Sequence, residues 1–144
     1  MSRAIHATAL VIGEKALLLL GESGTGKSAL AERLIAEARA EGRFARLVGD
    51  DRILLRAEGG RLLAAPHPAI TGRIERRGLG IGTTEWLGAA VVALAVTIEP
   101  NPPRLPEPET ETLELEGIRL PRLALRADRD LAARAHLVLG RLRD

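Results

Sequence analysis

Gly21-Glu22-Ser23-Gly24-Thr25-Gly26-Lys27-Ser28 is the most informative stretch of this 144-residue sequence. It fits the spacing Gly-x4-Gly-Lys-Ser/Thr and lies between an apolar run and a segment with helical periodicity, a context that distinguishes a phosphate-binding loop from a chance glycine-rich turn. In such a loop, backbone N–H groups and the helix N-terminus bind phosphate oxygens. Lys27 neutralises the outer phosphates and the Ser28 hydroxyl ligates Mg²⁺. We therefore predict that the whole loop binds a nucleoside triphosphate.

The use of lysine supports this interpretation. Of the 21 basic residues, only Lys15 and Lys27 are lysines, so the chain otherwise uses arginine for its positive charge. A compact ammonium group acts as a point charge on phosphate oxygens, which the planar fork of arginine would not reproduce. Lys27 is therefore expected to have a specific role in the loop.

The segments on either side of the loop predict a hairpin and a helix. Apolar runs at residues 9–12 and 16–20 are separated by Gly13-Glu14-Lys15, which is typical of a β-hairpin. If Ile12 faces Lys15, the same register places His6 opposite Gly21, beside the phosphate site. Without that register, a strand histidine with no role is the simpler interpretation. A helix is expected from Lys27 to Glu41, with Leu30, Leu34 and Ala38 on one face and Gly42 as its C-cap.

The rest of the chain predicts further strands and a second helix. Strands are expected at residues 46–49, 53–56, 61–64 and 89–98, and one or two more at 112–125. Loops are expected at 66–80, which contains prolines and glycines, and at 100–108, which contains five prolines. Asp128 is expected to cap a last helix that presents one apolar face, formed by Leu131, Ala135, Val138 and Leu142.

The acidic pair Asp50-Asp51 follows the strand at residues 46–49. An acid at the carboxyl end of a strand beside a phosphate loop is where a metal-linked carboxylate is expected. Successive strand side chains point to opposite faces, so one acid could hold the metal or its waters while the other accepts a proton from a hydroxyl nucleophile. The alternative for such a pair is a solvated turn.

Arginines in two predicted loops are weaker candidates. In Arg76-Arg77-Gly78-Leu79-Gly80 the glycines allow close backbone approach and the arginines could grip an anionic partner, although a solvated basic loop explains these residues equally well. Arg104 lies in the proline-rich loop, where a solvated side chain is the ordinary expectation. A phosphoryl-transfer site nevertheless needs positive charge for its transition state.

Composition narrows the class of protein. The length predicts one domain, and with no cysteine the chain has no disulfide framework and no thiolate metal site. A net charge of +2 with one Phe and one Trp argues against nucleic-acid binding. The longest nearly apolar run, residues 88–98, is too short for a membrane helix. We expect a soluble, cytoplasmic protein with no nucleic-acid or membrane partner.

Several motifs, taken in chain order, resemble the catalytic domain of HPr kinase/phosphorylase, the bacterial enzyme that phosphorylates a serine of the phosphocarrier protein HPr. The resemblance spans most of the chain. It rests on a histidine 15 residues before Gly21 (His6), the phosphate loop, Leu47-Val48-Gly49-Asp50-Asp51-Arg52, and Glu75-Arg76-Arg77-Gly78-Leu79-Gly80-Ile81. The last of these is similar to the family's signature Glu-x-Arg-Gly-Leu-Gly-Ile.

The resemblance implies roles for individual residues. It makes Asp50 the general base for the serine hydroxyl and the general acid in the reverse phosphorolysis. It assigns His6, Lys27 and Arg104 to the phosphoryl group, and Ser28 with Glu75 to Mg²⁺. Asp51 is a further candidate metal ligand from its place beside Asp50, while Arg77 and Gly78 are candidates for partner contact or phosphorolysis.

The last loop departs from the family pattern. Residues 124–129 resemble the family's Pro-Val-x-x-Gly-Arg loop, which is linked to dephosphorylation and would place Arg129 near inorganic phosphate. Ala124 and Asp128 replace the family's Pro and Gly, so phosphorolysis is expected to be weaker than kinase activity. The N-terminal regulatory domain of longer relatives is expected to be absent, which leaves residues 1–144 as one catalytic domain with a possible homo-oligomeric assembly.

We therefore expect an α/β P-loop nucleotide-binding domain of the phosphoenolpyruvate-carboxykinase-like type, with a mixed sheet and flanking helices. The expected function is ATP- and Mg²⁺-dependent phosphorylation of HPr or a paralogue. Two alternatives remain: a P-loop small-molecule kinase, which would normally carry an arginine-rich lid, and a non-catalytic ATP-binding sensor, which would not need the second acid at Asp50. The sequence has no Asn-Lys-x-Asp motif for guanine, so a GTPase is disfavoured.

Overall fold

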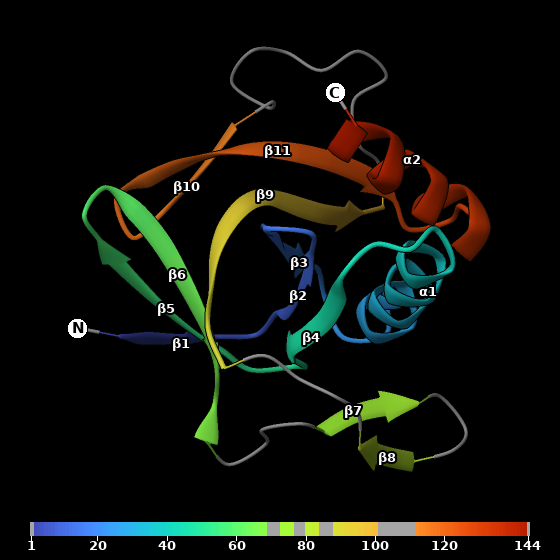
Figure 1. Ribbon diagram of the computed structural model, residues 1–144, viewed down its shortest axis with the longest axis horizontal. Coiled ribbons are helices and arrows are strands. Elements are labelled where there is room, and N and C mark those ends of the chain that lie inside the picture. The colour runs from blue at the N-terminus through green and yellow to red at the C-terminus, as the bar shows by residue number, and fades with distance from the viewer. Residues whose placement is uncertain (1, 69–72, 77–79, 84–87, 101–111, 144) are drawn as a thin grey trace.

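The computed structural model shows two helices against a curled, mixed β-sheet (Figure 1). It describes residues 2–68, 73–76, 80–83, 88–100 and 112–143, and at 73–76 and 80–83 it describes the backbone. The elements are β1 (Arg3–Ile5), β2 (Thr8–Ile12), β3 (Lys15–Leu20), α1 (Lys27–Ala40), β4 (Ala45–Gly49), β5 (Ile53–Glu58), β6 (Arg61–Pro66), β7 (Arg73–Arg76), β8 (Gly80–Thr83), β9 (Ala90–Glu99), β10 (Thr112–Leu115), β11 (Ile118–Arg126) and α2 (Leu131–Arg143). The predicted α/β class with a mixed sheet is confirmed.

One sheet runs in the order β1-β5-β6-β9-β3-β2-β4, and β11 adds to β9 and carries β10 on its other side. The long strand β9 joins the two halves, because its first residues pair with β6 and its later residues pair with β3 and β11. β3, β9 and β11 are parallel to one another. β4 shares their direction, because β3 and β4 are both antiparallel to β2. The carboxyl ends of these four strands therefore lie at one edge of the sheet.

The predicted hairpin before the phosphate loop is confirmed in its register. Ile12 pairs with Lys15, and the ladder continues to Thr8 opposite Leu19. The extrapolation to His6 is wrong, because the β2–β3 ladder ends at Thr8 and His6 lies in the bend between β1 and β2. β1 leaves the hairpin to pair with β5, so His6 is carried away from a position opposite Gly21.

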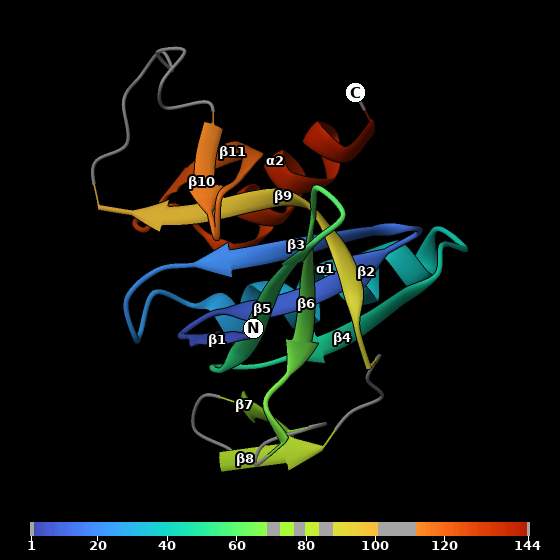
Figure 2. The same cartoon turned by 90° about the vertical axis from the view of Figure 1, so that its left-hand side faces the viewer.

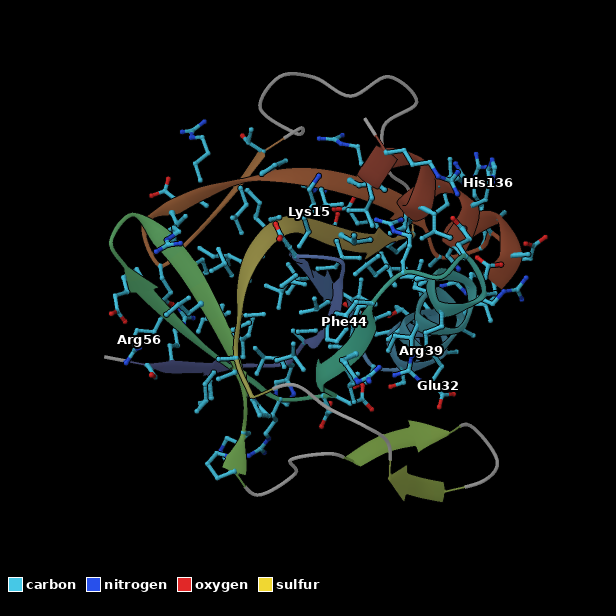
Figure 3. The ribbon with its side chains drawn as sticks, in the orientation of Figure 1. Lys15, Glu32, Arg39, Phe44, Arg56 and His136 are labelled. Carbon is cyan, nitrogen blue, oxygen red and sulfur yellow. The ribbon has the colours of Figure 1, made fainter. Side chains whose placement is uncertain are left out.

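Two apolar cores explain why β2 and β3 are buried on both faces. Leu10, Leu17 and Leu19 face α1 and α2, whereas the alternate residues Val11 and Leu18 face β5 and β6. This alternation follows from the two-residue period of a strand. Figure 2 shows β5 and β6 crossing over β2 and β3, and Figure 3 shows side chains filling the space between the sheet and the helices. The phosphate loop thus leaves a strand that is held rigidly between two cores.

The C-terminus of α1 is capped by a glycine. α1 ends at Ala40, and Gly42 adopts φ +77° after it. The N–H of Gly42 donates to the carbonyl of Arg39 and the N–H of Arg43 to that of Ala38, which is the pair of bonds of a Schellman motif. The predicted stop at Gly42 is confirmed.

The predicted cap of the last helix is wrong by two residues. Asp130, rather than Asp128, accepts the backbone N–H of Ala133 at 2.7 Å and so caps α2. Asp128 instead receives two hydrogen bonds from the Arg126 guanidinium, at 3.0 and 3.1 Å. Both acids precede the helix, and only the backbone geometry decides which one faces its free N–H groups.

The segment expected as one loop at 66–80 also contains strands. β7 and β8 form an antiparallel hairpin in which Glu75 pairs with Ile81, so the loop prediction is wrong for residues 73–76 and for Gly80. Pro66, the first residue of the expected loop, is the last residue of β6. The predicted strands after α1 are confirmed as β4, β5, β6, β9, β10 and β11. Residues 101–108 of the expected proline-rich loop lie outside the described residues. Among the described helices, neither is long and apolar enough to cross a membrane.

Candidate active site

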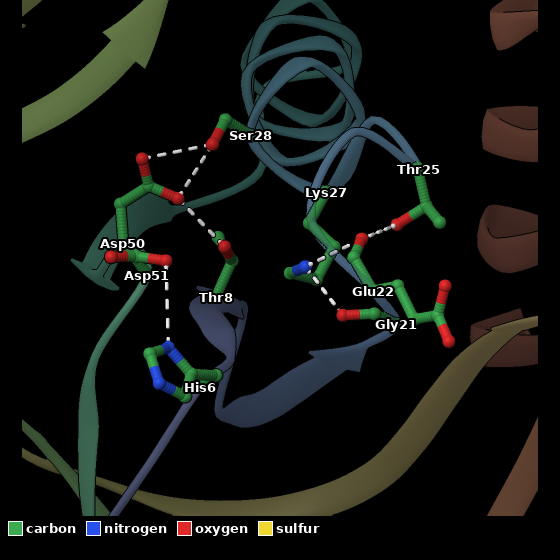
Figure 4. Close-up of polar contacts among 9 residues, drawn as sticks. All are labelled: His6, Thr8, Gly21, Glu22, Thr25, Lys27, Ser28, Asp50 and Asp51. Atoms are coloured by element: carbon green, nitrogen blue, oxygen red, sulfur yellow. Dashed lines mark hydrogen bonds and ion pairs between the residues drawn. The ribbon is translucent and has the colours of Figure 1, made fainter.

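The candidate site lies where β3 and β4 end and β2 begins. β2 is antiparallel to both neighbours, so its first residues lie beside the last residues of β3 and β4. An irregularity in the β2–β4 ladder, where Ala9 pairs with Gly49 and Leu10 with Leu47, brings Thr8 next to Asp50. The N–H of Ala7 also donates to the carbonyl of Asp51 at 3.2 Å. Residues far apart in the sequence therefore meet at the mouth of the phosphate loop (Figure 4).

The phosphate loop turns sharply between β3 and α1. Gly24 and Gly26 have φ of +86° and +92°, a region that L side chains rarely adopt. The Thr25 hydroxyl and backbone N–H both bond to the carbonyl of Glu22, at 2.7 and 3.2 Å. A Cβ on Gly21 would lie 2.8 Å from Thr25 Oγ1, so glycine is needed for the loop to close on itself. Two of the glycines are thus required by conformation and one by space.

Lys27 occupies the inside of this loop. The residue is 9% exposed, and its ammonium group donates to the carbonyls of Gly21 and Glu22 at 2.6 and 3.2 Å. The other lysine, Lys15, is exposed at the far end of β3 (Figure 3). The structure therefore buries the lysine of the motif and leaves the other one in solvent. A positive charge held inside a ring of backbone groups suits an anionic ligand.

Asp50 lies 4% exposed beside the first turn of α1. The Ser28 hydroxyl lies 2.7 and 2.8 Å from its two carboxylate oxygens, and the Thr8 hydroxyl donates to Oδ1 at 2.6 Å. A carboxylate with short contacts to two hydroxyl groups is fixed in position, because hydrogen bonds to ionised acceptors are strong. The cluster of Thr8, Ser28 and Asp50 is the most tightly connected part of the site.

Asp51 diverges from Asp50 and faces His6. Its φ of +71° turns the chain out of the strand, and its Oδ1 lies 3.8 Å from His6 Nδ1. Both side chains are exposed, His6 at 76% and Asp51 at 62%. The two acids therefore have different surroundings, since Asp50 is buried against Ser28 and Asp51 is open to solvent with an imidazole beside it.

The end of β11 lies at the same edge of the sheet. Arg129 is exposed in the turn before α2, and its N–H donates to the carbonyl of Arg126. The Arg126 guanidinium lowers the pKa of Asp128, chiefly through their side-chain hydrogen bonds. Earlier in the strand, Arg122 bonds to Thr97 and forms an ion pair with Glu99, which ties β11 to β9.

Several predicted site residues cannot be placed with the others. Arg77, Gly78 and Arg104 lie outside the described residues, and Glu75 is described only as a backbone position in β7. Within the loop, the side chains of Glu22 and Ser23 are exposed while their backbone forms the turn. The structure thus brings together His6, the phosphate loop, Asp50 and Asp51.

Two residues of the site were missed by the sequence analysis. Thr8 is the one polar residue in β2, a strand that is buried throughout. A single polar residue at the start of an apolar strand is the sequence signal that could have indicated its role. Arg134 is buried on α2 and donates to the carbonyl of Thr25 in the phosphate loop at 2.7 Å. Its signal is a charged residue on the apolar face, between Leu131 and Val138 at helical spacing.

The residues present fit a nucleotide with a divalent cation. Mg²⁺ is normally held by one or two protein oxygens together with phosphate oxygens, which matches the adjacent Ser28 hydroxyl and Asp50 carboxylate. Among the described residues, no group of three His, Asp or Glu side chains could hold a metal by itself. A cation here would therefore depend on the phosphates of its ligand for part of its coordination.

Comparison with known proteins identifies similar chains. Residues 1–99 match the family model described as HPr Serine kinase C-terminal domain. The HPr kinase/phosphorylase of Mycoplasma mycoides subsp. mycoides SC is 36% identical over 76 residues, a match that covers 53% of this chain and 22% of that protein. The chain therefore matches about a fifth of that relative's length.

A solved structure matches almost the whole chain. The Hpr(Ser) kinase/phosphatase from Coxiella burnetii has a TM-score of 0.76 to this structure at 27% sequence identity, with 98% of this chain and 97% of that chain covered. The similarity extends through β10, β11 and α2, which the family model does not reach.

Proposed function

Because the chain belongs to the HPr serine kinase C-terminal domain family, we propose that it transfers the γ-phosphoryl group of ATP to a serine of the phosphocarrier protein HPr or a paralogue. The observation that carries this proposal is the placement of Lys27 and Asp50. Both are buried at the mouth of one phosphate loop, one as a cation and one as a carboxylate. That combination suits phosphoryl transfer to a hydroxyl group, which needs charge neutralisation and a proton acceptor.

Lys27 and the loop bind the triphosphate. The ammonium group that now bonds to the carbonyls of Gly21 and Glu22 exchanges these acceptors for oxygens of the outer phosphates. A phosphate oxygen carries formal charge, so the exchange is favourable in a site that excludes most water. The N-terminus of α1 adds its N–H groups on the same side.

Asp50 acts on the acceptor. Its carboxylate removes the proton of the HPr serine hydroxyl while the oxygen attacks the γ-phosphorus, and the bond from that phosphorus to the β,γ-bridging oxygen breaks to release ADP. Thr8 and Ser28 hold the carboxylate in one orientation during this step. Ser28 would hold Mg²⁺ through its hydroxyl oxygen, and the cation would supply positive charge to the phosphates.

The remaining predicted residues have supporting roles in this proposal. His6 stands beside Asp51 at the open side of the cluster, where it can approach the transferred phosphoryl group. We assign Asp51 and Glu75 to the waters or inner ligands of Mg²⁺, and Arg77, Gly78 and Arg104 to contacts with the phosphoryl group or HPr. Arg129 would receive inorganic phosphate if the reverse phosphorolysis takes place.

The test is an incubation of the chain with ATP, Mg²⁺ and candidate HPr proteins, read by intact mass. A gain of one phosphoryl group on HPr is expected, and replacement of the acceptor serine by alanine should remove it.

Lys27→Ala should abolish the transfer, because no other ammonium or guanidinium group is bonded to the Gly21 and Glu22 carbonyls in the described part of the chain. Normal turnover by this variant would exclude the phosphate loop as the donor site.

The same experiment separates the alternative functions. ATP consumption without a change in HPr, in the presence of small hydroxyl compounds, would indicate a small-molecule kinase. ATP binding with no transfer to any acceptor would indicate a sensor.

A further inference from the structure

Arg134 has an unusual environment for an arginine. It lies on the face of α2 that packs against α1, is 9% exposed, and donates from Nη1 to the carbonyl of Thr25 at 2.7 Å. Its Nε is buried and, among the residues that the structure describes, has no hydrogen-bond partner. Burying a guanidinium group costs free energy, so a position that retains one invites a functional explanation.

The guanidinium group packs on the backbone of Gly26. This glycine is the N-cap of α1 with φ of +92°, and a Cβ built there would lie 3.2 Å from Nη1 and 3.3 Å from Nη2 of Arg134. The absence of a side chain therefore lets Arg134 reach the point where the phosphate loop becomes the helix. In Figure 4 the ribbon of α2 passes along the right-hand side, next to Thr25.

The hydrogen bond to Thr25 also orients an N–H group. The Thr25–Gly26 peptide is trans, so its carbonyl and N–H point in opposite directions. Because the carbonyl is directed to Arg134 on α2, the Gly26 N–H is directed to the side of the loop away from α2. N–H groups at this point of a phosphate loop are the ones that bind phosphate oxygens.

We propose that Arg134 is a positioning residue for nucleotide binding. It holds the Thr25–Gly26 peptide with its N–H toward the phosphates, and it adds a buried positive charge on the α2 side of the loop. The inference rests on the nucleotide-binding part of the proposed function. Arg134 lies beyond residues 1–99, so the segment that matches the family model does not contain it. The C-terminal helix is then part of the ATP site as well as part of the core.

The test compares Arg134→Met with Arg143→Met. Arg143 is the matched control, because it also links α2 to the end of α1, through exposed hydrogen bonds to Glu41 at 3.2 and 3.3 Å, but far along the helix from the loop. Affinity is measured with a fluorescent ATP analogue and Mg²⁺, without HPr. Arg134→Met should weaken binding about 10- to 100-fold, the range for one lost hydrogen bond to a charged group. Arg143→Met should bind within about twofold of the unmodified chain.

Two further measurements separate positioning from a purely structural role. A structural role lowers the melting temperature equally with and without ATP, whereas a positioning role lowers the rise in melting temperature that ATP produces. In the transfer assay, Arg134→Met should raise KM for ATP and leave KM for HPr unchanged. If Arg134→Met does not fold, Arg134→Lys is used to test the inference. Lysine keeps the positive charge but has a single nitrogen in place of the guanidinium group, so this variant should bind ATP about 3- to 10-fold more weakly than the unmodified chain.

Unchanged ATP affinity in Arg134→Met, or in Arg134→Lys where the first variant does not fold, would overturn the inference. Equal loss in the Arg143 control would overturn it as well. Absence of HPr phosphorylation by the unmodified chain would defeat the transfer proposal alone, since the comparison of ATP affinities does not involve HPr.

Discussion

Asp50 shows how one side chain acquires a function from its neighbours. An aspartate after a strand is ordinarily solvated, but this one is 4% exposed and contacts the hydroxyl groups of Thr8 and Ser28. The two hydroxyls come from different elements, the start of β2 and the first turn of α1. The carboxylate is therefore held in place before any ligand arrives, which is the arrangement that makes a positioned proton acceptor effective.

Asp50→Asn should separate binding from chemistry. The amide keeps one oxygen for Ser28 or Thr8 and nearly the same shape, but it cannot accept the serine proton. We expect kcat to fall by about 10²- to 10⁴-fold, the usual contribution of a general base, with ATP affinity nearly intact. Steady-state kinetics and direct ATP titration measure the two quantities. Thr8→Val is the companion variant, with a smaller loss of kcat because only one hydrogen bond to the carboxylate is removed. Lost ATP affinity at unchanged kcat in Asp50→Asn would make Asp50 a binding residue instead.

Asp128→Gly should favour the reverse reaction. The Arg126 guanidinium lowers the pKa of Asp128, so this carboxylate is ionised at neutral pH, and its charge interacts with that of the neighbouring Arg129. If phosphate binds at Arg129 in a pocket that both side chains share, the carboxylate should repel it. Any stability from the pair is present above the unfolded-state pKa of Asp128 and is lost as the pH falls through its lower folded-state pKa. The glycine variant removes the negative charge and frees Arg126, so phosphorolysis should rise more than kinase activity.

The readout for this prediction is pyrophosphate released from phosphoserine-HPr and phosphate, compared with forward transfer by the same preparations. Strong phosphorolysis by the unmodified chain would contradict it.

At the scale of elements, α2 is held by its cap and by its buried face. Asp130 supplies the cap, and Ala135, Val138, Leu139 and Leu142 belong to the core that also contains α1 and the inner face of β2 and β3. The helix also carries Arg134 to the phosphate loop. The position of its first turn therefore matters for both stability and the proposed nucleotide site.

Asp130→Ala should destabilise the protein, and Asp128→Ala should not do so comparably. Loss of an aspartate N-cap costs about 1 kcal/mol, whereas a solvent-exposed ion pair such as Arg126–Asp128 contributes little to stability. Urea unfolding of both variants at neutral pH measures the two free energies. A larger loss in Asp128→Ala would return the cap to Asp128, against the 2.7 Å bond to Asp130.

At the scale of the whole molecule, the sheet joins two cores on its opposite faces, and the site lies where the shared strands end. The helices cover one face, and β5 and β6 cover the other (Figure 2). Strands buried on both sides cannot shift register without exposing apolar residues, so the ends of β2, β3 and β4 are fixed relative to one another. This rigidity is what holds Thr8, Gly21 and Asp50 in one place.

Leu139→Ala tests whether α2 closes the helical core. Leu139 is 4% exposed and Leu137, two residues earlier on the same helix, is 39% exposed. Replacement of the buried leucine should lower the free energy of unfolding by about 2–5 kcal/mol, because it leaves a cavity. Leu137→Ala is the matched control and should change it by about 0.5 kcal/mol or less. Equal effects in denaturant melts would mean that α2 does not pack against the core as described.

Much of the fold could be predicted from local patterns. The hairpin register before the phosphate loop, the extent of α1 to its glycine stop, and the strands β4, β5, β6, β9, β10 and β11 follow from local patterns. These patterns are periodicity, turn residues and glycine chemistry, which act between near neighbours in the chain. The β7–β8 hairpin was missed, because its glycines indicate a loop when read alone.

What the sequence could not determine depends on strands and helices that meet from distant parts of the chain. His6 leaves the hairpin because β1 pairs with β5, and no local pattern states that pairing. Asp130 caps α2 in place of Asp128 because the backbone turn aims it at the free N–H groups. Thr8 and Arg134 enter the site only after β4 packs beside β2 and α2 packs beside α1. The loop, its lysine and the acid at Asp50 were predictable, since each lies in a contiguous sequence pattern. Their partners were not predictable, because hydrogen bonds across 42 or 109 residues form only when the burial of two apolar cores brings those segments together.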